Sequence, residues 1–131
     1  MTKKRINIEK PLNSKSPNII WSLIGRPEGL AKWVADEVKQ DEEALIFTWG
    51  DLTRHFETRI ADILEVERNQ HLKFRWRDEE PDTFIELKID KSEITGDYIL
   101  SITDFANDED IDTLHDLWED NLERLHHSSG L

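Results

Sequence analysis

The sequence predicts an α+β domain in which a curved antiparallel sheet wraps around a long C-terminal helix. Three observations lead to this fold class. A broken helix follows the first strand, the middle of the chain alternates between apolar and polar residues, and the last segment carries an apolar stripe at helical spacing. Short hairpin connections favour antiparallel pairing, and the stripe must be buried against one face of the sheet.

The first strand and the first helix are predicted from spacing and capping residues. In RINIEK (5–10), Ile6 and Ile8 alternate with polar residues, as in a half-buried strand. Ser16 is a good N-cap, and Pro17 suits the first turn of the helix that follows. The apolar residues of this helix recur at spacings of three and four. They are Ile19, Ile20, Leu23 and Ile24.

The helix is expected to break and resume. Gly25 and Pro27 end it, because proline lacks an N–H and disfavours helical geometry at Arg26. A second short helix is predicted after the break, so that two short helices separate the first two strands. The apolar residues of this second helix are Leu30, Trp33 and Val34.

The acidic stretch 36–43 is predicted to be a loop, and about five strands follow it. Glycine and aspartate at 50–51 indicate a tight turn. The strands are predicted in ALIFTWG (44–50), RHFETRIADILEVE (54–67), HLKFRWR (71–77), TFIELKI (83–89) and YILSITDF (98–105).

The long second strand of this series has two apolar faces. Phe56, Thr58, Ile60, Leu64 and Val66 share one parity, and we expect this parity to face inward. An aspartate at position 62 interrupts the series, and the apolar residues at 61 and 63 lie on the other face. A bulge or bend near position 62 is therefore predicted, and it would curve the strand.

The last segment is predicted to be a long amphipathic helix. Asn107 is a suitable cap, and acidic residues at 108–110 in the first turn meet the positive end of the helix dipole. The final residues HHSSGL (126–131) are expected to fray. The apolar stripe consists of Ile111, Leu114, Leu117, Trp118, Leu122 and Leu125.

Composition narrows the classes of function. The 131 residues suit a single domain, 1–131, and no apolar run approaches the roughly 20 residues that span a bilayer. The formal net charge of −12 disfavours nucleic acid and anionic membranes as partners. This charge serves solubility, or it steers a basic partner. The N-terminus lacks the apolar stretch of a signal peptide, and there is no cysteine, so a cytoplasmic location is expected.

The order of these elements resembles that of the START-like superfamily, also called SRPBCC or helix-grip proteins. ALIFTWG and TDFANDEDIDTLHDLWEDNLERL stand in the corresponding places. The segment IIWSLIGRPEGLAKWVAD (19–36) is similar to one in proteins related to the activator of the 90-kDa heat-shock chaperone ATPase, although Val34 replaces a second tryptophan that is frequent there. The matching residues are Trp21, Leu23, Ile24, Pro27, Glu28, Leu30, Ala31 and Trp33.

This resemblance implies a helix-grip fold with a cavity between the sheet and the long helix, which in many relatives takes apolar ligands. Many members of the superfamily are uncharacterised bacterial proteins. We expect the broken helix to brace the open end of the grip. Its bend would place Leu30, Trp33 and Val34 over the mouth of the cavity, with Trp33 as a gate.

The candidate ligand-binding residues are those at positions expected to face inward. They either line a pocket for a lipid or a ring system, or they fill the core and close it. No cofactor or metal is expected, because no histidine stands in an H-x-x-x-H spacing and no glycine-rich phosphate loop is present. The candidates are Trp33, Val34, Phe47, Trp49, Phe56, Thr58, Phe74, Trp76, Leu100, Trp118 and Leu122.

Three functions remain open. The favoured one is a non-catalytic binding module for a small apolar ligand. The second is a chaperone-regulating or other protein-interaction domain, with a chaperone or a second copy of the chain as partner. The third, a cyclase- or aromatase-type enzyme, is least favoured. The strand parities bring only Asp62 inward as an acid–base candidate, and a bulge would turn it to water.

Overall fold

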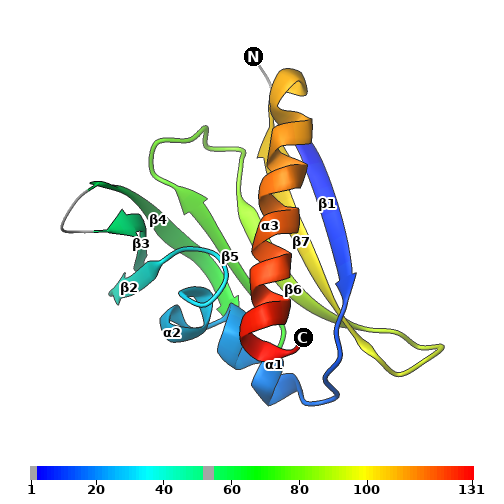
Figure 1. Cartoon of the computed structure of the whole chain (residues 1–131). Helices are drawn as coiled ribbons and strands as arrows, with labels where there is room; N and C mark the ends of the chain where they lie inside the picture. Colours follow the sequence, from blue (N-terminus) through cyan, green and yellow to red (C-terminus); the bar gives the residue numbers. More distant parts are fainter. Residues whose placement is uncertain (1–2, 52–54) are drawn as a thin grey trace.

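The computed structural model describes residues 3–51 and 55–131. Its centre is one seven-stranded antiparallel sheet with the order β1-β7-β6-β5-β4-β3-β2. The helix α3 (Ile111–Ser129) lies along the β1–β7 side of the sheet (Figure 1). The short helices α1 (Pro17–Ile24) and α2 (Pro27–Leu30) lie at the C-terminal end of α3 (Figure 1). The strands are β1 (Lys4–Pro11), β2 (Glu37–Asp41), β3 (Ala44–Asp51), β4 (His55–Glu67), β5 (His71–Trp76), β6 (Ile85–Lys91) and β7 (Tyr98–Ala106).

The curved sheet, the long C-terminal helix and the two short helices confirm the predicted fold class. Within the described residues, no helix is both long enough and apolar enough to cross a bilayer.

The break between α1 and α2 follows the predicted rules. Ser16 caps α1, and its hydroxyl accepts a hydrogen bond from the Ile19 amide at 3.3 Å. Gly25 is the C-cap of the helix, and only glycine fits there, because a Cβ would lie 2.3 Å from the ring of Trp21. Pro27 then starts α2. The chain therefore turns sharply where a side chain larger than hydrogen does not fit.

The prediction of a loop over 36–43 is wrong, because residues 37–41 form the edge strand β2. Val38 is its one buried side chain and pairs with Phe47 of β3. The neighbouring positions are charged or polar, which is usual for an exposed sheet edge. A single inward-facing position is too little alternation to identify a strand from sequence. The predicted tight turn falls partly outside the described residues, since Gly50 and Asp51 end β3 and the connection, 52–54, is not described.

The predicted bulge in β4 is confirmed, but the predicted inner face of the strand is wrong. The pairing of β4 with β5 shifts register between Ile63 and Glu65. Before this bulge, Ala61 pairs with Trp76 on the inner face. Phe56 and Thr58 therefore lie on the outer face, where 48% of Phe56 is exposed. Before the bulge, the more apolar parity of the strand is thus the one that faces away from α3.

The helix α3 is longer than expected. It continues to Ser129, so the predicted fraying of 126–129 is wrong. Gly130 adopts a left-handed conformation with φ = 80° and its amide donates to the carbonyl of His126 at 2.8 Å. This C-cap satisfies a terminal carbonyl, and Leu131 beyond it is buried in the core.

Candidate functional site

A cavity of about 320 Å³ lies between the sheet and α3. Side chains from β3, β4, β5, β6, β7 and α3, and from the turn after α2, line it. Its apolar walls are formed by Val34, Trp49, Phe74, Trp76, Ile85, Leu114, Leu117 and Trp118. Its polar lining consists of Glu57, Arg59, Asp104 and Asn121.

The aromatic wall of the cavity is a packed cluster. The ring centroids of Trp49 and Trp76 are 6.1 Å apart, and those of Phe74 and Trp76 are 5.8 Å apart in an edge-to-face arrangement. Phe47 supports this wall from the core, 5.1 Å from Trp76. The indole N–H of Trp49 donates to the Val34 carbonyl at 3.0 Å. The wall is therefore held in place without a ligand.

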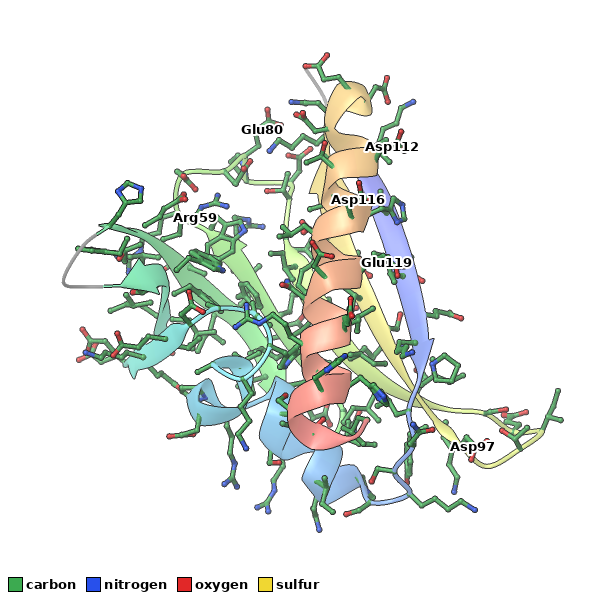
Figure 2. All side chains as sticks on the ribbon, viewed as in Figure 1. Arg59, Glu80, Asp97, Asp112, Asp116 and Glu119 are labelled. Carbon is green, nitrogen blue, oxygen red and sulfur yellow. The ribbon has the colours of Figure 1, made fainter. Side chains whose placement is uncertain are left out.

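Arg59 is a residue of β4 that lines the cavity. Figure 2 labels it to the left of α3. Its guanidinium carbon lies 4.2 Å from the centroid of the Trp76 ring, a cation–π contact. One terminal nitrogen is 2.9 Å from Asp78 and 3.7 Å from Glu79. The hydrogen bond from Arg59 lowers the pKa of Asp78. The positive charge at the cavity is thus already shared by two carboxylates.

Asp104 is the most strongly perturbed group of the site. One of its carboxylate oxygens accepts the indole N–H of Trp118 at 2.9 Å, and the other accepts the amide of Phe105 at 2.7 Å. Burial raises the pKa of Asp104 to about 6 despite these hydrogen bonds, which act in the opposite direction. A smaller hollow of about 120 Å³ adjoins the cavity and shares Arg59 and Asp104 with it.

Five of the eleven candidate residues line the cavity. Four others are buried in the core around it, and the remaining two, Phe56 and Thr58, lie on the opposite face of the sheet. Those that line the cavity are Val34, Trp49, Phe74, Trp76 and Trp118. Those buried in the core are Trp33, Phe47, Leu100 and Leu122.

Trp33 does not occupy the position of a gate. Its side chain is fully buried, and its indole N–H donates to the carbonyl of Leu23 at 2.8 Å. Its ring packs beside Trp118 with centroids 6.1 Å apart. The bend between α1 and α2 therefore places Trp33 behind the cavity wall, and Leu117, 52% exposed, is the apolar residue at the cavity's solvent side.

All four polar lining residues were missed by the sequence analysis, although each follows a regular pattern. Glu57 and Arg59 share the parity of Ala61, which was assigned to the outside of β4. Asp104 continues the inward parity of Leu100 in β7. Two turns of α3 after Leu114, Asn121 falls on the buried stripe. Asp62, in contrast, faces solvent and pairs with Arg77, the residue after β5, at 3.0 Å.

Comparison with known proteins agrees with this geometry. The model of the START-like superfamily domain matches residues 1–131. No curated protein matches the chain. The solution NMR structure of BfR322 from Bacteroides fragilis is 38% identical, with 97% of this chain and 91% of that chain covered and a TM-score of 0.64.

Two more distant structures share the fold alone. The Aha1 dimer of Colwellia psychrerythraea is 14% identical, over 97% of this chain and 98% of that chain, with a TM-score of 0.72. CalU16 of Micromonospora echinospora is 22% identical, over 95% and 75% of the two chains, with a TM-score of 0.70. Because the START-like domain matches this chain over its whole length, the chain belongs to the START-like superfamily.

Proposed function

We propose that this chain is a non-catalytic binding module that holds a small, largely apolar molecule between the sheet and α3. The observation that carries the proposal is the cavity of about 320 Å³ beside Trp49, Trp76 and Trp118. Ligand pockets commonly measure about 300–1,000 Å³ and combine apolar walls with a few polar groups. The lining of this cavity has that composition, and its volume favours a small ring system.

The arrangement of the polar groups supports binding over catalysis. Both oxygens of Asp104 already accept hydrogen bonds, and Arg59 is held by carboxylates and by the ring of Trp76. A general acid or base must reach a reacting proton within hydrogen-bond distance. Here the carboxylate is engaged in positioning the wall of the cavity.

The proposal is tested with the neutral fluorescent probe N-phenyl-1-naphthylamine, whose emission rises in apolar surroundings. The wild-type chain is expected to bind it. Leu117→Trp adds bulk at the solvent side of the cavity and should weaken binding by about tenfold or more. Ile19→Trp on α1 is the matched control, because Ile19 is 55% and Leu117 52% exposed. Absence of wild-type binding, or equal binding by the two tryptophan variants, would refute the proposal.

A second candidate function is protein interaction through the outer face of β4. Phe56 and Ile60 are 48% and 36% exposed on this face of the strand. Apolar side chains that gather at a surface often mark an interaction site. Sedimentation velocity of the wild type and of a Phe56→Ser, Ile60→Ser double variant tests self-association. A wild-type monomer at all concentrations would leave a chaperone as the partner to seek by pull-down.

A further inference from the structure

One polar side chain of the cavity is well buried and forms no hydrogen bond with the described part of the protein. Asn121 is only 7% exposed, lines the cavity, and forms no side-chain hydrogen bond with any other residue that the structure describes. Its amide atoms are not among the fully enclosed polar atoms of the described residues that lack a partner, so they are open to the cavity. The carboxamide can therefore present its oxygen as an acceptor and its N–H₂ group as a donor to a molecule in the cavity.

The place of Asn121 in the helix makes this offer specific. Leu114, Trp118, Asn121 and Leu125 follow one another at spacings of four, three and four, so they form one buried face of α3. The other three are apolar and pack between the helix and the sheet. A leucine at 121 would satisfy the stripe. Departures from such a pattern are expected at functional sites.

The charges around the cavity disfavour an anionic ligand. An anion would lie beside Glu57 and Asp104, while Arg59 already contacts the carboxylates of Asp78 and Glu79. Like charges in a poorly hydrated site repel each other strongly. A cation would meet the carboxylates of Glu57 and Asp104 as well as the guanidinium of Arg59, so the lining gives it no such repulsion. A neutral molecule avoids the repulsion that an anion meets.

The walls favour a flat ligand. Trp49, Trp76 and Trp118 meet the same space and present large aromatic surfaces, which bind other aromatic rings by offset stacking or edge-to-face contact. A volume of about 320 Å³ is at the low end for ligand pockets.

We propose that the ligand is a neutral, planar aromatic molecule that carries a hydrogen-bond donor next to an acceptor, as in an aromatic lactam, and that Asn121 recognises this pair. The inference rests on the proposed function, because it specifies the ligand of the same cavity. It adds a specificity-determining residue on α3 and excludes fatty acids as preferred ligands.

The test uses four probes of similar two-ring shape. 2-Quinolone has both the donor and the acceptor, N-methyl-2-quinolone lacks the donor, naphthalene lacks both, and 2-naphthoate is an anion. Dissociation constants are measured from the shifts of tryptophan indole N–H signals in ¹H–¹⁵N spectra, which also report the site of binding. The wild type should bind 2-quinolone about tenfold more tightly than N-methyl-2-quinolone or 2-naphthoate, the ratio that one added hydrogen bond supplies, and more tightly still than naphthalene, which lacks both groups.

The variant Asn121→Leu separates recognition from packing. It removes both the donor and the acceptor, so it should weaken the binding of 2-quinolone by about tenfold or more and leave the binding of naphthalene unchanged or tighter. Asn13→Leu, at an exposed asparagine outside the cavity, is the matched control and should keep the wild-type ratios. Thermal unfolding of each variant verifies the fold.

Two results would overturn the inference: equal wild-type affinities for 2-quinolone and N-methyl-2-quinolone, or a preference that survives in Asn121→Leu. If naphthalene binds but the preference for 2-quinolone is absent, the inference fails while the proposed function stands. If neither these probes nor N-phenyl-1-naphthylamine binds the wild type, the proposed function fails as well.

Discussion

The buried carboxyl of Asp104 predicts a dependence of stability on pH that runs against the usual direction for carboxylates. Its pKa is raised from 3.8 to about 6 by burial. The folded chain therefore holds this proton more tightly than the unfolded chain, and protonation stabilises the fold. The contribution is fully present below pH 3.8 and is lost as the pH rises through 6. The two pKa values differ by about 2.2 units, which corresponds to about 3 kcal/mol at 1.36 kcal/mol per unit.

The measurement is the free energy of unfolding in urea, from pH 4 to pH 7, for the wild type and for Asp104→Asn. The many other carboxylates affect both proteins alike, so the difference between the two curves isolates position 104. The side-chain amide of the variant places its N–H₂ group against one of the two N–H groups that donate to Asp104. The free-energy cost of this unfavourable contact does not change with pH. Relative to the variant, the wild type should lose about 2 kcal/mol between pH 4 and pH 7.

A difference that stays constant over this range, or that grows with pH, would refute the reasoning. A constant difference would mean that water reaches the carboxyl and that burial does not control its pKa. The carbonyl ¹³C signal of the Asp104 side chain gives an independent check, since its titration midpoint should lie near 6.

Two further predictions concern the cavity wall and the two faces of the sheet. Trp118→Phe removes the hydrogen bond that lowers the pKa of Asp104, so the ¹³C titration midpoint should move above 6; an unchanged midpoint would show that this bond is not formed in solution. Phe74→Ala should cost about 3–5 kcal/mol in urea unfolding, because Phe74 is fully buried. Phe56→Ala should cost less than about 1 kcal/mol, because Phe56 faces outward. Equal losses for the two phenylalanines would contradict the observed orientation of β4.

The sequence was sufficient for the fold because its signals are local and agree with one another. Ser16, Gly25 and Pro27 each act through the backbone of their immediate neighbours, and the structure places the helix start and the break at these residues. The apolar stripe on α3 is also a local signal, because it depends only on the spacing of residues along this one helix. Together with the alternating strands, these signals leave few arrangements that bury every apolar face.

The face of β4 could not be assigned in this way. Alternation separates the side chains of a strand into two sets, but it does not say which set meets the core. The more apolar set, which includes Phe56 and Ile60, lies outside. The inner set includes Glu57 and Arg59, because this part of the sheet borders a cavity with access to solvent. An apolar pattern therefore misleads where the interior is an open cavity instead of packed core.

The cavity itself results from uneven packing along α3. At the C-terminal end of the helix, Leu122 and Leu125 are buried in the hydrophobic core. The short helices α1 and α2 lie at this end of α3 (Figure 1). Toward its N-terminal end, Leu117 remains half exposed and borders open space. The bulge after Ile63 bends β4 just beyond the part of the strand that faces this space. The end of the grip with α1 and α2 is thus filled by packed apolar side chains, and the cavity lined by Trp49, Trp76 and Asn121 lies beside the less densely packed part of α3.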